Sequence, residues 1–364
     1  MIAPTPDLLP PPPSIAREPL SIGGLPIPSR FFLAPLAGYT SLAYRRTVRQ
    51  LGGLGLATTD LVNARSLIER RPKSLELAAT CPADRPVSIQ IYGPVVEEMR
   101  QAAKMVVDLG ATIVDINMGC PVRKVVKCGS GSALMNDLDA ARRLVSAVVE
   151  AAGVPVTVKM RLGWDSQSHS APELARAFER DGVAAVIIHG RTRSQGFTGT
   201  VDLDGIARVV EAVDRIPVVG NGDIRTLADA RRMFDRTGCS AVSIGRGSLS
   251  NPFFFRQLLQ WAEHGDPGPE PTFEDRVAVM ERHFYGLVET RGERMACLQF
   301  RKILKWYNYA IRPQKALYHK LINLPSAALF AETIAEIRAA GPASPLPTQF
   351  EPRVPVPTGP IDKW

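Results

Sequence analysis

Cys120 has the most distinctive chemical surroundings of any residue in this 364-residue chain. It follows Asn117-Met118-Gly119 and precedes Pro121, which holds the loop in an extended or turned path. A cysteine there can act as a nucleophile, a metal ligand or a proton donor. No Cys or His partner stands at a metal-ligand spacing, so no metal site is predicted. A small buried apolar side chain is the ordinary alternative for a free cysteine, and Cys128 is expected to be inert.

Glycines beside polar residues recur after two later apolar runs, in Asn221-Gly222-Asp223 and in Gly245-Arg246-Gly247. A backbone without side chains lets amide N–H groups approach a phosphate closely, and the following helix N-terminus favours an anion. Arg246 can add a charge-assisted hydrogen bond. These segments therefore predict a phosphorylated ligand, and tight turns with positive φ are compatible with that prediction.

Gln90 and Lys159 stand at the ends of otherwise apolar runs. A lysine that points across a barrel mouth needs an acceptor, and a reduced flavin ring offers negative charge near its N1 and C2 carbonyl. Gln90 has both a donor and an acceptor for the amide-like edge of such a ring. A water-facing surface lysine is the alternative interpretation.

The elements that carry these residues alternate between short apolar runs and segments with helical periodicity. The predicted strands are 31–34, 54–58, 87–91, 113–117, 156–160, 185–189, 217–220 and 241–244. The clearest helices are 95–109, 138–152, 172–180, 227–236 and 251–263, several ending on glycine (Gly110, Gly153, Gly238). Eight such units predict a (β/α)8 TIM barrel, whose strand ends meet at one rim. An open doubly wound sheet is the alternative, but its glycine-rich fingerprint after the first strand is missing.

Composition divides the chain into four parts. Prolines concentrate at both ends, so 1–27 and 341–364 are predicted to be Pro-rich, solvated tails, with ligands for a proline-reading partner as the alternative. The barrel spans 28–264. Residues 265–340 have helical periodicity broken at Pro313 and Pro325, and we expect a small all-helical domain there.

The overall composition excludes some classes of protein. No run of about 18 uncharged apolar residues is present, so no spanning helix is expected. The five cysteines are too scattered for a disulfide scaffold, and the N-terminus lacks the pattern of a secretory signal, so the expected location is cytoplasmic. The net charge of +8 is compatible with a polyanionic partner but does not require one.

Taken together, the motifs resemble those of the tRNA-dihydrouridine synthases, and the bacterial B-type branch is the most similar. The resemblance covers about residues 28–335 and rests on segments 34–38, 117–121, 131–134, 189–193 and 221–224. It implies an FMN-binding barrel followed by a helical RNA-binding domain, with Cys120 as the catalytic acid. The residues implied to bind FMN are Pro35, Leu36, Ala37, Gln90, Lys159, His189, Asn221, Gly222, Asp223, Gly245 and Arg246. Leu36, Phe197 and Leu203 depart from the residues that are frequent in the family.

The chemistry implied is reduction of the uracil C5–C6 double bond, with NADPH as the electron source. Flavin N5 gives a hydride to C6, and Cys120 gives a proton to C5. The target base must leave its stack, so the enzyme needs other contacts to the tRNA. Between residues 294 and 320 the chain has seven basic and no acidic residues. The expected RNA-binding residues are Arg191, Arg193, Arg301, Lys302 and Lys305; Trp306, Tyr307 and Tyr309 can stack on bases, although at least half of these aromatic residues should form the domain core.

Two other functions remain open on the sequence. One is a small-molecule flavin oxidoreductase on the same barrel, against which the basic helical domain argues. The other is an RNA-binding protein that has lost catalysis, against which Cys120, Lys159 and His189 argue. Ribosomal RNA as a target, NADH as the donor and the uridine position also stay open. A monomer is expected.

Overall fold

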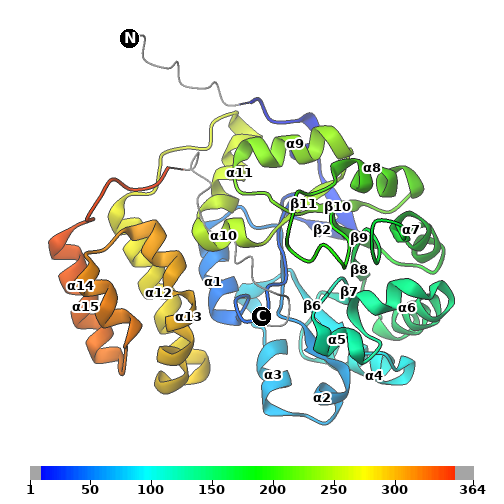
Figure 1. Ribbon diagram of the computed structural model, residues 1–364, viewed down its shortest axis with the longest axis horizontal. Coiled ribbons are helices and arrows are strands. Elements are labelled where there is room, and N and C mark those ends of the chain that lie inside the picture. The colour runs from blue at the N-terminus through cyan, green and yellow to red at the C-terminus, as the bar shows by residue number, and fades with distance from the viewer. Residues whose placement is uncertain (1–9, 349–364) are drawn as a thin grey trace.

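Eight parallel strands close into a barrel (Figure 1). The computed structural model describes residues 10–348. The barrel strands are β3 Phe31–Leu33, β4 Leu56–Thr58, β6 Val87–Tyr92, β7 Ile113–Met118, β8 Val156–Arg161, β9 Ala185–His189, β10 Val218–Asn221 and β11 Ala241–Ile244. The ring closes because β11 pairs with β3 and β4 pairs with β6. The short β5 Val62–Asn63 adds a third partner for β6, besides β4 and β7. The predicted TIM barrel is confirmed, and the open sheet is excluded.

Helices surround the barrel, and most follow a strand directly (Figure 1). They are α1 Leu42–Leu51, α2 Ala64–Ile68, α3 Pro72–Ala78, α4 Val96–Asp108, α5 Arg123–Lys127, α6 Leu138–Ala152, α7 Ala171–Arg180, α8 Leu203–Ala212, α9 Leu227–Thr237, α10 Arg246–Ser250 and α11 Phe254–His264, with 3-10 turns η1 Ser14–Arg17, η2 Pro82–Asp84 and η3 Gly131–Asn136. Gly153 and Gly238 adopt the left-handed conformation expected at helix ends. At the end of α4 the cap is Leu109, and Gly110 follows it with φ +105°.

The interior of the barrel has an apolar floor and a polar mouth. Phe32, Leu56, Ile113, Ile187 and Val219 belong to one buried cluster that is separate from the core between strands and helices. Because side chains on one face of a strand recur every second residue, the polar residues of the sequence motifs lie on this same inner face, nearer the carboxyl ends.

A hairpin covers the floor of the barrel, so residues 14–27 are not the solvated tail that the sequence predicts. Strands β1 Leu20–Ile22 and β2 Leu25–Ile27 pair antiparallel. Leu20, Ile22 and Ile27 are buried in the same cluster as the floor residues. Burial of these apolar side chains stabilises the hairpin more than the neighbouring prolines favour an extended, solvated chain. Residues 1–9 of the predicted tail lie outside the described part of the chain.

Four further helices form the part of the molecule at the left of Figure 1: α12 Phe273–Arg291, α13 Glu293–Ile311, α14 Lys315–Ile322 and α15 Ala327–Ala340. The breaks at Pro313 and Pro325 occur as predicted, and a further break at Gly292 has φ +76°. Aromatic side chains pack between these helices. Phe284, for example, stacks on Phe330 with ring centroids 3.8 Å apart. They pack against the barrel through α1, where Gly286 lies close to Ala43.

Residues 341–348, the start of the predicted C-terminal tail, are hydrogen-bonded to these helices. Ala343 N donates to Arg312 O over 2.8 Å, and Arg276 Nη2 donates to Pro347 O over 2.9 Å. The remainder of that predicted tail, 349–364, lies outside the described residues. Within 10–348 no helix is both long and apolar enough to cross a membrane.

Candidate active site

The barrel mouth brings together five of the polar residues singled out from the sequence. Gln90, Asn117, Lys159, His189 and Asn221 lie at or near the carboxyl ends of β6 to β10. Strand register places Asn117 beside Lys159 and Asn221 beside His189. Neighbouring strands therefore line the inner wall with hydrogen-bonding side chains, at the end of the barrel where active sites of this fold lie.

Lys159 is held by the wall on its β10 side. Its Nζ donates to Asn221 Oδ1 over 3.0 Å, and Asn221 in turn donates from Nδ2 to Ser243 O over 2.7 Å. Burial, and to a smaller extent the nearby Arg161, lower the pKa of the Lys159 ammonium to about 8. The amine is thus mostly charged at neutral pH and fits a ligand that brings negative charge into the mouth.

His189 is neutral in this site. Burial, followed by the positive charges of Arg161 and Lys159, holds the pKa of the imidazole well below its usual range. Its Nε2 lies 3.4 Å from Arg191 Nη1, and the ring of Phe197 lies 6.3 Å away between centroids. A neutral imidazole can hydrogen-bond a ligand without adding charge.

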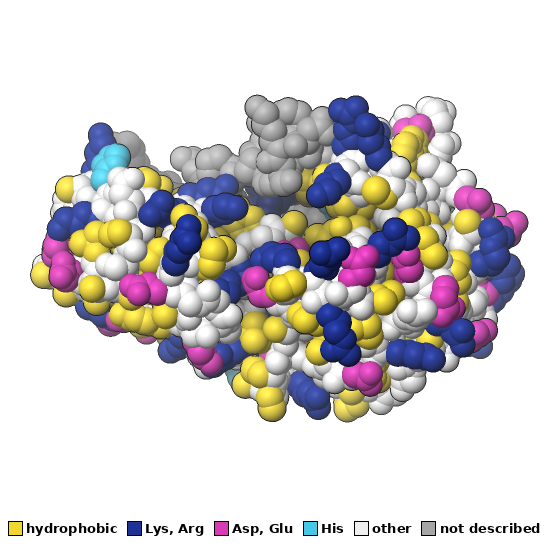
Figure 2. Space-filling model, turned by 90° about the horizontal axis from the view of Figure 1, so that it is seen from below, with side chains coloured by type: hydrophobic (Ala, Val, Ile, Leu, Met, Phe, Trp, Pro, Cys, Tyr) yellow, Lys and Arg dark blue, Asp and Glu magenta, His cyan; other side chains and the backbone are white. Residues whose placement is uncertain are grey.

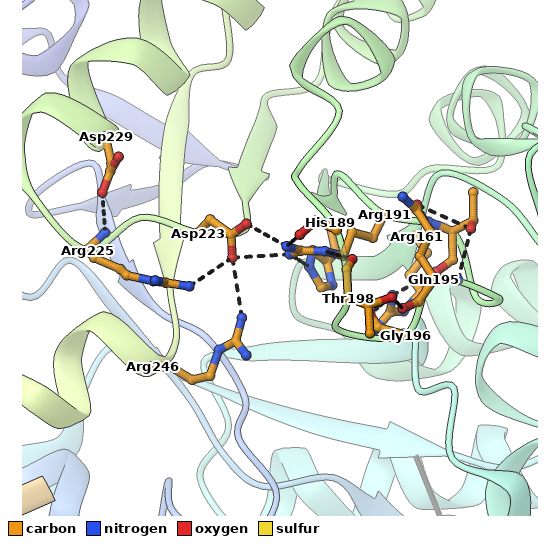
Figure 3. Close-up of polar contacts among 12 residues, drawn as sticks. Arg161, His189, Arg191, Gln195, Gly196, Thr198, Asp223, Arg225, Asp229 and Arg246 are labelled. Carbon is orange, nitrogen blue, oxygen red and sulfur yellow. Dashed lines mark hydrogen bonds and ion pairs between the residues drawn. The ribbon is translucent and has the colours of Figure 1, made fainter. Parts of the chain in front are cut away.

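The loop after β10 collects three arginines around one carboxylate (Figure 3). Asp223 Oδ1 lies 3.6 Å from Arg225 Nη2 and 3.3 Å from Arg246 Nη2, and Asp223 Oδ2 accepts from Arg191 Nη2 over 2.5 Å. The backbone that presents this carboxylate is unusual, with φ +126° at Gly222 and φ +51° at Asp223. The result is a concentrated positive surface beside the barrel mouth.

Arg191, one of the residues expected to bind RNA, is buried in this structure, with only 2% of it exposed. Besides Asp223, its guanidinium donates to Thr198 O over 3.0 Å and to Gly199 O over 2.6 Å. The side chain therefore holds the loop after β9 together from inside, and its role in RNA binding stays a prediction.

The predicted phosphate loop has a buried donor that could serve an anion. Arg246 Nη1 is buried and has no hydrogen-bond partner among residues 10–348. Its neighbour Gly247 packs directly on backbone, since a Cβ there would lie 2.4 Å from Ile224 O. The opposite side of the loop is formed by 35–37, because a Cβ on Gly245 would lie 3.1 Å from Leu36 Cδ2. Residues expected to cradle one ligand thus do converge, from β3, β10 and β11.

Cys120 is half-buried in a loop, and both its backbone N and its backbone O are hydrogen-bonded. Asn117 Oδ1 accepts from Cys120 N over 3.0 Å, and Ser132 Oγ donates to Cys120 O over 3.1 Å. Burial raises the pKa of the Cys120 thiol despite the nearby Arg161 and Lys159. The thiol is therefore protonated at neutral pH and suits a proton donor. Cys128, by contrast, is exposed, and both thiols are free.

Two buried residues of the site were not among the predicted site residues. Arg161 donates from Nε to Gly119 O over 2.8 Å, and from Nη1 to Thr192 O and Gly196 O over 2.9 and 2.7 Å. It thereby joins the Cys120 loop to the loop after β9. Asp115 lies two residues before Asn117 and is 2% exposed. An acidic residue within the apolar run 113–118 was the signal that could have identified it.

The expected RNA-binding helix is α13, and its aromatic residues divide as anticipated. Arg301, Lys302 and Lys305 are exposed, whereas Trp306 and Tyr307 are buried. Tyr307 Oη lies 2.9 Å from His283 Nδ1, and Trp306 packs edge-on against Tyr39 of the loop after β3. On the barrel, Arg193 stacks over Trp164 at 4.6 Å from the ring centroid.

A family model described as dihydrouridine synthase (Dus) matches residues 32–336. The chain belongs to the dihydrouridine synthase family. A probable tRNA-dihydrouridine synthase of Rickettsia bellii (strain RML369-C) is 37% identical over 306 residues, covering 84% of this chain and 93% of that protein. The tRNA-dihydrouridine synthase B of Pasteurella multocida (strain Pm70) is 36% identical over 294 residues, covering 81% and 88%. The family indicated by the motifs is confirmed, and a B-type protein is among the relatives.

Solved structures share the fold at low sequence identity. The 6-hydroxypseudooxynicotine amine oxidase of Pseudomonas geniculata N1 superposes with a TM-score of 0.54 and 15% identity, covering 76% of this chain and 55% of that one. This similarity shows the barrel fold alone. As a dihydrouridine synthase family member, the chain is an enzyme that makes dihydrouridine. Among residues 10–348, no group of three or more His, Cys, Asp or Glu side chains is arranged to hold a metal ion.

Proposed function

We propose that this chain is an FMN-dependent tRNA-dihydrouridine synthase that reduces the C5–C6 double bond of uridine with NADPH as the electron source. The observation that carries the proposal is the convergence, at one barrel mouth, of a protonated thiol and a cluster of cations. The charges of Lys159 and Arg161 both act on the Cys120 thiol. The loop at Arg246, which is predicted to bind phosphate, follows β11 at the same rim of the barrel. The family match is independent support.

The cofactor would be held by residues at the barrel mouth. Asn221, Gly222, Gly245 and Arg246 are suited to its phosphate, where Arg246 Nη1 has an unused buried donor. Lys159 is suited to the electron-rich side of a reduced ring. Residues 35–37 and Gln90 would complete the binding surface, together with His189. Bound in this way, reduced FMN supplies the hydride for C6 of the uracil.

Cys120 would supply the proton for C5. A general acid must be protonated before the reaction and lie close to the atom that it protonates. Burial keeps the thiol protonated, and Asn117 and Ser132 hold its backbone. Lys159 and Arg161 then stabilise the thiolate that remains, because their positive charges favour the ionised sulfur.

The helical domain would bind the body of the tRNA. Arg301, Lys302 and Lys305 are exposed on α13 and form one surface, because residues three and four apart on a helix are neighbours. Figure 2 shows Lys and Arg side chains on this part of the molecule, at the left, and further ones across the middle of the same face. On the barrel, Arg123 and Lys124 of α5 are exposed three and four residues after Cys120. Such a distribution fits a polyanion that reaches from the helices to the mouth.

The test uses the purified full-length chain and tRNA isolated from a strain without dihydrouridine synthases. We expect flavin absorbance, NADPH oxidation that is stimulated by this tRNA, and dihydrouridine in the product by mass spectrometry. A colourless protein that binds no FMN would overturn the proposal. Oxidation of NADPH with small enones but never with tRNA would instead favour a small-molecule reductase.

A further inference from the structure

Asp115 is a buried carboxylate inside the barrel to which the proposed mechanism assigns no role. It lies on β7 with its side chain on the inner face, like Asn117, and it is 2% exposed. Burial raises the pKa of this carboxyl to about 6, although hydrogen bonds from Thr157 and Gln90 and the charge of Lys159 oppose the shift. At pH 7 and above it is mostly ionised. A buried charge of this kind is costly, so its partners indicate what it does.

A continuous chain of hydrogen bonds leads from Asp115 to the backbone of Cys120. Asp115 Oδ1 accepts from Thr157 Oγ1 over 2.6 Å, and Asp115 Oδ2 accepts from Gln90 Nε2 over 2.6 Å. Gln90 Oε1 accepts from Asn117 Nδ2 over 2.7 Å. Asn117 Oδ1 then accepts from Cys120 N over 3.0 Å. We call Asp115, Gln90 and Asn117 the relay.

The hydrogen bonds of the relay can run from donor to acceptor in only one direction. An ionised carboxylate can only accept hydrogen bonds, and a backbone N–H can only donate. Between these fixed ends stand two side-chain amides, each with one donor and one acceptor end. Reversing either amide places a donor against a donor or an acceptor against an acceptor. Asp115 at one end and the backbone N–H groups of Gly119 and Cys120 at the other therefore require the same orientation, in which Asn117 presents its oxygen to the N–H of Cys120.

We propose that Asp115 is a positioning residue for the proton donor, because as an acceptor-only group at the end of the relay it fixes Asn117 and thereby the Cys120 backbone. The inference rests on the proposed function, in which Cys120 is the acid. An error of about 1 Å in the placement of a reacting group can cost roughly a hundredfold in rate.

Asp115 could instead serve only as a counter-ion for Lys159, and Thr157 distinguishes the two roles. In Asp115→Asn the introduced amide can turn its NH2 group toward Thr157 Oγ1, which can accept, and the relay keeps its direction. In Asp115→Asn with Thr157→Val that acceptor is gone. The introduced amide then lacks a partner for its NH2 group in one orientation and for its oxygen in the other, so this end no longer fixes the direction of the relay. A counter-ion role depends on charge alone, so it gives no extra loss in the double variant.

The experiment measures two half-reactions of the FMN-loaded enzyme by stopped flow, namely reduction by NADPH and reoxidation by dihydrouridine-free tRNA. For reoxidation we expect a loss of about threefold in Thr157→Val and about tenfold in Asp115→Asn, the range of single hydrogen bonds. The double variant should lose more than the product of these, about a hundredfold or more. Reduction by NADPH should change less than about threefold in all variants. Ser88→Ala, a buried inner-face side chain with no hydrogen-bond partner, is the matched control.

A second measurement is independent of activity. In cofactor-free protein, the alkylation rate of Cys120 by iodoacetamide, with exposed Cys128 as internal reference, should rise in the double variant because its loop is released. Multiplicative losses in the double variant, equal losses in both half-reactions, or unchanged alkylation of Cys120 would each overturn the positioning role. If wild-type protein bound no FMN or made no dihydrouridine, the proposed function itself would fail, which the wild-type control reports separately.

Discussion

At the scale of single residues, two cysteines of one loop at the barrel mouth have different surroundings. Cys120 is half-buried among cations, and Cys128 is exposed eight residues later. We expect Cys120→Ala to bind FMN and tRNA as the wild type does but to lose at least about 10²-fold in the formation of dihydrouridine, the usual contribution of a general acid. Cys128→Ala is the control and should keep its rate. Wild-type turnover in Cys120→Ala would remove this thiol from the mechanism.

Asp115 should also impose a pH dependence on stability. Its pKa is about 6 in the folded protein and near 3.8 when unfolded, so the folded state binds more protons between these values. Its contribution to stability therefore falls as the pH rises from 4 to 6, and the full cost is present above 6. Asp115→Asn lacks this cost. We expect its melting temperature, relative to wild type, to increase by a few degrees between pH 4 and pH 7. A constant difference across this range would show that Asp115 does not titrate in this way.

Residues at strand ends were predictable because a polar side chain that ends an apolar run is conspicuous. Gln90, Lys159 and Asn221 were identified in this way, and they do converge. The burial of Arg191 was not predictable, since an arginine in a loop motif does not reveal that it will pair with a carboxylate 32 residues later. Asp115 was overlooked because its partners come from the two neighbouring strands, β6 and β8, and tertiary structure alone brings them together.

At the scale of elements, the β1–β2 hairpin acts as the plug of the barrel floor. Ile22 is 1% exposed within the cluster that also contains Phe32 and Leu56. We expect Ile22→Ala to lower the free energy of unfolding by about 2–4 kcal/mol through lost burial and a residual cavity. Ser21→Ala, on the exposed side of the same strand, should change it by less than about 0.5 kcal/mol. Thermal melts of the two variants compare their stabilities. Equal stability would mean that the hairpin does not contribute to the barrel core and behaves as a tail.

The barrel strands were predictable and this hairpin was not, for a physical reason. A strand buried on both faces is a continuous apolar run, as in Ala185–His189, whose five residues are all buried. The hairpin strands have three residues each and stand among prolines that favour extended chain. Their stability comes from the barrel floor, which is distant in sequence.

At the scale of the whole molecule, the helical domain is tied to the site by buried polar contacts. Tyr44 of α1 donates from its hydroxyl to Ser248 O in α10 over 2.7 Å, and its ring lies 5.2 Å from that of His283 on α12. His283 reaches Tyr307 on α13. Helix α13, which we propose to bind RNA, is thus connected through two layers of side chains to the helix that begins at Arg246, and this connection would fix the distance between a tRNA bound on α13 and the barrel mouth.

This arrangement separates binding of tRNA from the chemistry with NADPH, and the separation can be measured. Lys302→Glu with Lys305→Glu reverses two exposed charges on α13 without touching the mouth. Affinity for tRNA should fall at least about tenfold at 100 mM salt. The slope of log affinity against log salt should decrease in magnitude by about 1.5, because two phosphate contacts are lost. NADPH oxidation without tRNA should stay unchanged.

The matched control, Lys104→Glu with Arg143→Glu, makes the same charge change on α4 and α6 of the outer barrel and should leave affinity within about threefold. Equal weakening in both double variants would mean that net charge, and not the α13 surface, attracts the tRNA.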